Sequence, residues 1–245
     1  MIAGDARILL HLLRGARRGV SHQERLQSFY APQAERYDAF RERLLHGRRE
    51  LIESIDLPDG ARVVELGGGT GRNLLFFGER LDRCAEVSLV DLCPALLEQA
   101  QRRFASRPAK VRLVEADASH WQPSEPVDLV YFAYSLSMIP DWRAAVDNAL
   151  RMLRPGGVLA AVDFYVSGAR AMPGRVRHGA LTRAFWPRWF AHDGVRLGPE
   201  TPDLLASSLP DHDLHECRGR VPYLGGLSVP YYRFVGRLDP DRPMR

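Results

Sequence analysis

The stretch that decides the fold is Val63-Val64-Glu65-Leu66-Gly67-Gly68-Gly69-Thr70-Gly71. An apolar run over 62–66 enters this glycine cluster, and a helical pattern over 73–81 follows it. Glycines let the backbone turn tightly and approach a ligand closely, and the N-terminus of the next helix offers unpaired N–H groups. The stretch therefore predicts a strand, a ligand-binding turn and a helix in succession.

Strand and helix patterns alternate after this turn. Further apolar runs occupy 86–91, 111–115, 127–131 and 158–164, and helical patterns occupy 94–104 and 142–153. Pro155-Gly156-Gly157 suits a stop after the second of these helices. Two late runs, 214–218 and 231–237, follow each other as an antiparallel edge pair. We therefore expect an α/β fold with a Rossmann-like, seven-stranded, mostly parallel sheet, helices on both faces and an antiparallel edge strand.

Composition fits one domain, with 45% hydrophobic and 26% charged residues among 245. The three cysteines, Cys84, Cys93 and Cys217, are widely spaced and odd in number, which favours neither a disulfide framework nor a zinc site. His212 and His215 near Cys217 match no common zinc spacing, so we expect no metal. No apolar stretch approaches the roughly 20 residues of a membrane span, and a cytoplasmic protein is expected.

The glycine turn differs from the dinucleotide-binding fingerprint. Gly67-x-Gly69 leads to Arg72 at the sixth position, where close packing of the helix needs Gly or Ala, so a pyrophosphate cofactor is disfavoured. Asp91 ends the second strand, where a carboxylate can accept hydrogen bonds from both ribose hydroxyls of an adenosyl group. For a lone aspartate, exposure to solvent or helix capping is the alternative.

Five motifs, in order over residues 61–164, resemble class I S-adenosylmethionine-dependent methyltransferases. They are Glu65-x-Gly67-x-Gly69-x-Gly71, Asp91, Glu115-Ala116-Asp117-Ala118, Asp128-Leu129-Val130-Tyr131-Phe132 with Ala133-Tyr134-Ser135, and Leu153-Arg154-Pro155-Gly156-Gly157-Val158-Leu159. The resemblance implies S-adenosylmethionine as the cofactor, methyl transfer to a small acceptor, and Asp117 facing the exocyclic amine of adenine. The cofactor ligands that it implies are Glu65, Gly67, Gly68, Gly69, Asn73, Asp91, Leu92, Asp117, Ala118 and Ala133.

The residues before the first strand predict a helix over 33–49, with Tyr37, Arg41, Leu44, Arg48 and Leu51 on one face. With Tyr30, this face resembles the N-terminal lid of methyltransferases acting on small amines, where such groups meet the methionine carboxylate. Tyr37 and Arg48 are therefore expected at the cofactor, and Tyr30, Tyr134 and Ser135 at the substrate. An ordinary charged surface helix is the alternative.

Two parts of the chain follow from these patterns. Residues 1–56 are expected to form an N-terminal helical extension and lid, and residues 57–245 the methyltransferase domain, with an insertion at about 165–205. In that insertion Trp186, Trp189, Phe190 and His192 form either a substrate cover or a small separate core. Tyr134 is the preferred positioning residue beside the reacting methyl, since an aromatic face stabilises a growing positive charge.

Three phrases resemble the betaine-lipid N-methyltransferases, which convert diacylglyceryl-homoserine to its trimethylated form. They are Phe29-Tyr30-Ala31-Pro32-Gln33-Ala34 continuing to Leu45-His46-Gly47-Arg48, then Ser135-Leu136-Ser137-Met138-Ile139-Pro140, and Val229-Pro230-Tyr231-Tyr232. The resemblance implies N-methylation of that lipid amine. A small-molecule O- or N-methyltransferase with a soluble acceptor remains the alternative, and so does a protein that binds the nucleotide without catalysis.

The formal net charge of +4 predicts attraction to anionic surfaces. Arg7, Arg14 and Arg18 lie on one side of an amphipathic N-terminal stretch, and the arginines between 170 and 188 form a second basic stretch. We expect a peripheral contact with an anionic membrane at its inner face; solvated charged surfaces are the alternative. No nucleic-acid partner is expected, because Ala133-Tyr134-Ser135-Leu136 lacks the pattern of base-amino methyltransferases and no nucleic-acid-binding module is visible.

Overall fold

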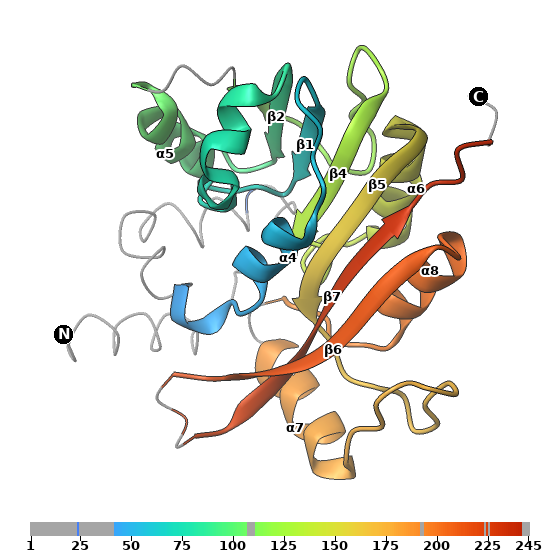
Figure 1. Cartoon of the computed structure of the whole chain (residues 1–245). Helices are drawn as coiled ribbons and strands as arrows, with labels where there is room; N and C mark the ends of the chain where they lie inside the picture. Colours follow the sequence, from blue (N-terminus) through green and yellow to red (C-terminus); the bar gives the residue numbers. More distant parts are fainter. Residues whose placement is uncertain are drawn as a thin grey trace.

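The computed structural model describes residue 24 and residues 42–106, 111–191, 194–222, 224 and 226–241. A seven-stranded sheet of order β3-β2-β1-β4-β5-β7-β6 runs through it (Figure 1). The strands are β1 Arg62–Leu66, β2 Glu86–Asp91, β3 Val111–Glu115, β4 Val127–Ala133, β5 Leu153–Phe164, β6 His212–Arg220 and β7 Ser228–Arg237. Neighbours among β1 to β5 pair in parallel, whereas β7 is antiparallel to both β5 and β6. The predicted fold class is confirmed.

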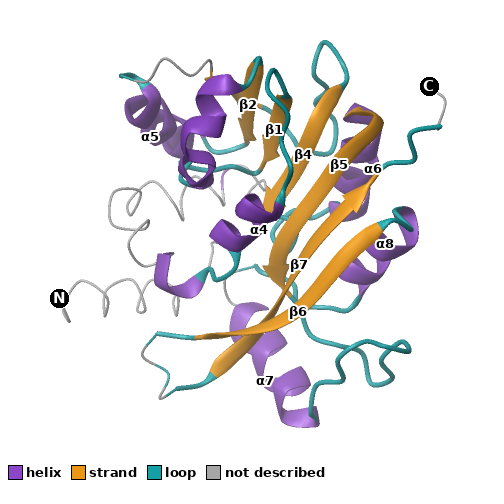
Figure 2. Ribbon diagram, in the orientation of Figure 1, coloured by secondary structure: helices purple, strands orange, loops and turns teal. Residues whose placement is uncertain are grey.

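Helices cover both faces of this sheet (Figure 2). The described helices are α4 Arg48–Ser54, the 3-10 helix η1 Asn73–Arg83, α5 Pro94–Phe104, α6 Trp142–Met152, α7 Ala180–Ala191 and α8 Glu200–Ser208. One core layer joins the sheet to α4, η1, α5 and α7, and a second joins it to α6 and α8. Strands buried on both faces carry continuous apolar runs, which is why β1, β2 and β4 could be predicted from the sequence.

Two elements differ from the expected pattern. Strand β5 begins at Leu153, so Pro155-Gly156-Gly157 lies inside the strand instead of ending a helix before it. The backbone of Leu238 holds this segment, because its carbonyl accepts from the Gly156 N–H and its N–H donates to the Gly157 carbonyl. The stretch after the glycine turn is a 3-10 helix that Gly78 interrupts with a φ of 59°.

The helix predicted over 33–49 is wrong at its C-terminal end. Gly47 has a φ of 81° and separates a turn at 45–47 from α4. A Cβ on Gly47 would lie 2.5 Å from a ring carbon of Tyr231, so β7 packs directly against the break. Leu44 and Arg48 therefore do not share one continuous helix face, and the residues expected before 42 lie outside the described part.

The segment between β5 and β6 carries α7 and α8. Trp186 and Phe190 of α7 are buried in the core layer that also holds Phe164 of β5, so they are core residues rather than a separate cluster. His192 lies outside the described residues. Among the described helices none is long and apolar enough to cross a membrane.

Candidate functional site

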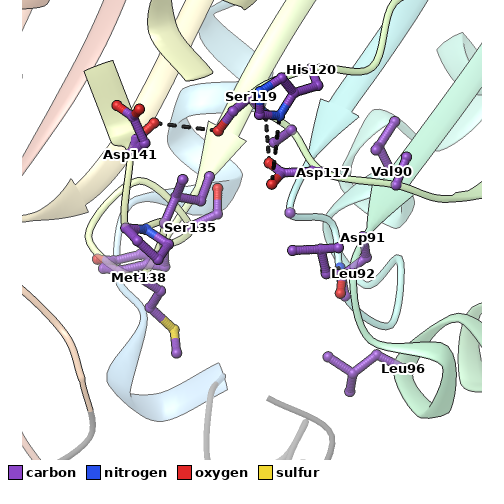
Figure 3. A pocket seen from close by; sticks show the side chains of 17 residues that line it. Val90, Asp91, Leu92, Leu96, Asp117, Ser119, His120, Ser135, Met138 and Asp141 are labelled. Carbon is purple, nitrogen blue, oxygen red and sulfur yellow. Dashed lines mark hydrogen bonds and ion pairs between the residues drawn. The ribbon is translucent and has the colours of Figure 1, made fainter. Parts of the chain in front are cut away.

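A cavity opens at the carboxyl edge of the parallel strands, where ligands bind in open α/β sheets (Figure 3). Its volume is about 380 Å³. Ser135 and Met138 stand on one side, and Asp91, Leu92 and Leu96 stand on the other. The residues that line it are Gly67, Gly69, Val90, Asp91, Leu92, Leu96, Ala116, Asp117, Ala118, Ser119, His120, Tyr134, Ser135, Met138, Ile139, Pro140 and Asp141.

The glycine turn forms the floor of this cavity. Gly67 has a φ of 69°, and a Cβ there would lie 2.5 Å from the Cβ of Ser135. The Ser135 hydroxyl donates to the carbonyl of Leu66 at 2.8 Å, and the Gly67 N–H donates to the carbonyl of Val90 at 2.8 Å. The loops after β1, β2 and β4 are thus joined at a point where only glycine fits.

Asp91 contributes a nearly buried carboxylate to the cavity wall. One oxygen accepts from the N–H of Gly69 at 2.8 Å, and the other accepts from the N–H of Cys93 at 2.8 Å. These two hydrogen bonds tie the carboxylate to the loops after β1 and β2. Asp91 therefore orders the two loops and also faces the cavity.

Asp117 and Ala118 line the far wall of the cavity, in the turn after β3. The Asp117 Oδ1 accepts from the Ser119 N–H at 2.8 Å, which fixes the side chain in the turn. Its Oδ2 lies 3.8 Å from the Nδ1 of His120 (Figure 3). The prediction that Asp117 and Ala118 share a site with Asp91 thus agrees with their positions.

Tyr134 lines the cavity in a strained backbone conformation. Its φ of 58° places a non-glycine residue in the left-handed region, which few residues with a side chain adopt. The hydroxyl donates to the carbonyl of His46 at 2.7 Å, and the ring lies edge-on to Phe164 with centroids 4.6 Å apart. Burial, with the nearby Asp163 carboxylate, raises the pKa of the Tyr134 phenol well above 10, so the phenol remains protonated.

A buried polar chain lies behind the glycine turn. The Asn73 amide donates to the Glu65 carboxylate at 2.7 Å, and the Arg48 guanidinium donates to the Asn73 amide oxygen at 2.9 Å. Arg48 also forms an ion pair with Glu42 at 3.3 Å. The three predicted cofactor ligands Glu65, Asn73 and Arg48 therefore meet one another but do not line the cavity.

The other predicted site residues divide into two groups. Gly68 packs against Leu89 and Glu65, and Ala133 is buried at the end of β4; neither lines the cavity. Tyr30 and Tyr37 lie outside the described residues. The roles assigned to all of these side chains stay predictions.

Asp163 is a buried carboxylate beside the site that the sequence analysis missed. It lies at the end of β5, where it accepts from the N–H of Ser137 at 2.9 Å, from the Ser137 hydroxyl at 2.7 Å and from the N–H of Phe164 at 2.8 Å. Burial raises the pKa of Asp163 to about 6, although these hydrogen bonds oppose the shift. Asp163 thus anchors the loop that carries Tyr134 and Ser135.

The sequence analysis also missed much of the apolar and loop wall. The missed lining residues are Val90, Leu96, Ala116, Ser119, His120, Met138, Ile139, Pro140 and Asp141. Leu96 lies in the first turn of α5, directly after the Asp91 loop, and that adjacency was an available signal. Residues 138–141 follow Ser135 within one loop, so the same reasoning applies to them.

Comparison with known proteins agrees with this geometry. A family model described as a methyltransferase domain matches residues 63–157. The ubiquinone/menaquinone biosynthesis C-methyltransferase UbiE of Azotobacter vinelandii is 31% identical over 214 residues, covering 84% of this chain and 83% of that protein. Trans-aconitate 2-methyltransferase of Azoarcus sp. is 33% identical over 126 residues, covering 51% of this chain and 48% of that protein. The match thus spans about half the length of the trans-aconitate enzyme.

Among solved structures, a phosphoethanolamine N-methyltransferase 2 of Haemonchus contortus, in complex with phosphomonomethylethanolamine and S-adenosylhomocysteine, has the same fold. The TM-score is 0.71 at 15% identity, covering 91% of this chain and 61% of that one. The family model and UbiE, which aligns over most of both chains, show the family of this protein. It belongs to the class I S-adenosylmethionine-dependent methyltransferases. Its cofactor is accordingly S-adenosylmethionine.

The glycine turn yields a first prediction. Gly67→Ala should destabilise the protein and weaken its binding of S-adenosylhomocysteine at least tenfold, because the new Cβ meets Ser135 and forces the two loops apart. We expect about 1 to 2 kcal/mol from the left-handed backbone and a further 1 to 3 kcal/mol from the clash.

The matched control is Gly60→Ala, since Gly60 has a φ of 79° but no heavy atom within 4 Å of an added Cβ. It should lose only the backbone contribution and bind S-adenosylhomocysteine like the wild type. Urea unfolding and titration calorimetry measure the two effects. Equal stability losses in both variants, with full ligand binding by Gly67→Ala, would contradict the close approach.

Asp163 yields a second prediction, on the pH dependence of stability. Its folded pKa of about 6 lies above the ordinary aspartate pKa of 3.8, so the native state favours the protonated form. The stabilisation is fully present below the unfolded pKa and is lost as the pH rises through the folded pKa. Asp163→Asn removes this titration.

The unfolding free energy of the wild type, measured relative to Asp163→Asn, should therefore fall by about 2 kcal/mol between pH 4.5 and pH 7. Any constant loss from the weakened Ser137 hydrogen bond cancels in this comparison. Urea unfolding at both pH values is the measurement. Parallel pH dependences for the two proteins would show that the buried carboxyl does not titrate as expected.

Proposed function

We propose that this cavity holds S-adenosylmethionine and that the enzyme transfers its methyl group to the amine of a lipid head group, diacylglyceryl-homoserine. The observation that carries the choice of acceptor is the charge of the cavity. Asp91, Asp117 and Asp141 line it, and no Lys or Arg is present among the described lining residues; with Asp91 and Asp117 assigned to the cofactor, Asp141 is the lining carboxylate left for the acceptor. Such a wall attracts an amine and stabilises the cationic product of its methylation.

The cofactor fits the cavity in size and donor chemistry. About 380 Å³ lies within the range of ordinary cofactor sites. We assign the ribose hydroxyls to Asp91, the adenine amine to Asp117 and the apolar contacts to Leu92 and Ala118. The rest of the molecule is proposed to lie over the closely approaching backbone of Gly67 and Gly69, which line the cavity.

The methionine end of the cofactor is assigned to the buried polar chain, which does not line the cavity and would have to open toward it when the cofactor binds. Glu65 lies under the glycine turn, and Asn73 and Arg48 connect it to the first turn of α4. A carboxylate and a guanidinium are the complements of the amino and carboxylate groups of a methionine moiety. Tyr37 and Tyr30 are proposed to close the site from the N-terminal side.

The chemistry then requires positioning more than proton transfer. When bound, the cofactor supplies an electrophilic methyl group to a neutral amine. Tyr134 holds an aromatic ring at the cavity wall, where it stabilises developing positive charge on the acceptor, and Ser135 stands beside it. The phenol of Tyr134 stays protonated and bonded to His46, so we assign it no role as a base.

Two other acceptors are supported by the relatives. C-methylation is the second candidate, because the C-methyltransferase UbiE aligns over 83% of its own length. A tricarboxylic acceptor such as trans-aconitate is less compatible with a cavity that carries Asp141 and no Lys or Arg among its described lining residues, and that relative matches over only 48% of its length. A soluble O- or N-acceptor remains the alternative to a lipid.

A third prediction concerns the cofactor. Asp91→Ala should weaken S-adenosylmethionine binding, because each charge-assisted hydrogen bond to a ribose hydroxyl contributes roughly 1.5 to 3 kcal/mol, or about 10- to 100-fold in affinity. Asp82→Ala removes the same charge from an exposed position outside the cavity and is the control. Titration calorimetry on folded protein decides, and unchanged affinity in Asp91→Ala would sink the assignment.

A fourth prediction concerns the acceptor. Incubation with S-adenosylmethionine and dispersed diacylglyceryl-homoserine should give products heavier by one, two and three methyl groups in mass spectrometry. Parallel reactions with trans-aconitate and with a quinol acceptor should give none. Methylation of the quinol on carbon, with no lipid product, would replace the leading proposal by the second candidate.

A further inference from the structure

The elements that carry the exposed large hydrophobic side chains lie at one end of the molecule (Figure 1). Across the described residues these side chains are Met172, Val176, Leu181, Phe185 and Leu227. The first four belong to the segment from β5 through α7, and Leu227 belongs to the β6–β7 hairpin. Exposed apolar side chains that are grouped in one region indicate an interaction surface, whereas ones scattered singly over a protein are ordinary.

Helix α7 divides into an anchored face and an outward face. Trp186 and Phe190 are buried, and Phe190 packs against Phe164 of β5 with ring centroids 4.7 Å apart. Leu181 and Phe185 are four residues apart and so share the outward face, where Leu181 is 87% exposed. The helix is therefore held to the core while it presents apolar side chains to its surroundings.

Exposed arginines lie in the same segment of the chain as most of these apolar side chains. Arg170, Arg177 and Arg188 are exposed, and no carboxylate of the described residues forms an ion pair with them. Residues 165–191 contain no Asp or Glu. Arg175 differs from its neighbours and from the sequence-based expectation, since it pairs with Asp203 at 3.0 Å and with Glu216 at 3.1 Å. It holds the loop to the domain instead of facing outward.

This end of the molecule is also the end that carries the cavity. In Figure 1, α7 and the β6–β7 hairpin lie at the lower end of the molecule, toward which the carboxyl ends of β4 and β5 point. Tyr134 of the cavity wall contacts Phe164, which contacts Phe190 of α7. Packed rings thus connect the proposed methyl-transfer position to α7, whose opposite face points outward.

We infer that the outward face of α7 and the loop before it form a docking surface for an anionic lipid bilayer. Exposed apolar side chains, together with exposed arginines that form no ion pair with a described residue, match an interface in which acyl chains lie beneath anionic head groups. The inference rests on the proposed function for its purpose, since docking brings a lipid acceptor to the cavity. Binding itself requires no methyl transfer and is measured separately.

The fifth prediction tests this surface with the full chain. The wild type should co-float with vesicles of phosphatidylcholine and phosphatidylglycerol and bind pure phosphatidylcholine vesicles much more weakly. Arg177→Gln and Arg188→Gln should each reduce partitioning about fivefold, and raising the salt concentration should reduce it further. A Leu181→Ser, Phe185→Ser double variant should lose at least tenfold.

The matched control is Arg143→Gln, an exposed arginine on α6, on the opposite face of the sheet. It should bind vesicles like the wild type. Circular dichroism and thermal stabilisation by S-adenosylhomocysteine establish that each variant is folded. The docking surface would be overturned if Arg143→Gln lost as much vesicle binding as Arg177→Gln and Arg188→Gln. It would also be overturned if the variants of α7 and of the loop before it bound vesicles like the wild type.

Two further outcomes separate this inference from its rivals. In the first, the wild type sediments as a dimer and the double variant as a monomer, while both bind vesicles equally. In that case the patch is a contact between two copies of the chain and the inference is wrong. If the variants lose vesicle binding but no methylated lipid forms with any protein, the docking surface stands and the proposed acceptor fails. Both failures are therefore distinguishable.

Discussion

The architecture of the site depends on one close approach, between the backbone of Gly67 and the side chain of Ser135. The loops after β1 and β4 meet so closely that no Cβ fits at Gly67. The Ser135 hydroxyl closes this contact on the carbonyl of Leu66, and the Asp91 carboxylate adds the loop after β2 through the N–H of Gly69. Three strand ends are thus fixed relative to one another before any ligand arrives, and such preorganisation lowers the cost of binding.

A second set of contacts extends this constraint to β5. Ser137 follows Ser135 in the same loop, and its N–H and hydroxyl both donate to Asp163. Placing a carboxylate in the core costs free energy, and its raised pKa measures that cost. The burial is tolerated because three donors satisfy the carboxylate. The loop that carries Tyr134 is therefore held at both of its sides by side-chain hydrogen bonds.

Sequence reasoning succeeded where local pattern determines structure. Buried parallel strands carry long apolar runs, and a glycine cluster between a strand and a helix has few other uses, so β1, β2 and the cavity floor were predictable. It failed where contacts between distant segments decide. The break at Gly47 exists because Tyr231 of β7 packs against it, and Asp163 lies within an apolar run that gives no sign of its partners. The same holds for His120, which joins the wall only through its position beside Asp117.

Tyr134 shows how these long-range contacts combine at one residue. Its positive φ costs of order 1 to 3 kcal/mol, and the conformation persists because its hydroxyl is bound by His46, its N–H by Val162 and its ring by Phe164. The carbonyl of His46 is available only because Gly47 turns the chain before α4. The ring is thus positioned by the segment before α4 and by β5 together. An aromatic face fixed in this way beside carboxylates is suited to a cation, which supports the proposal of an amine acceptor.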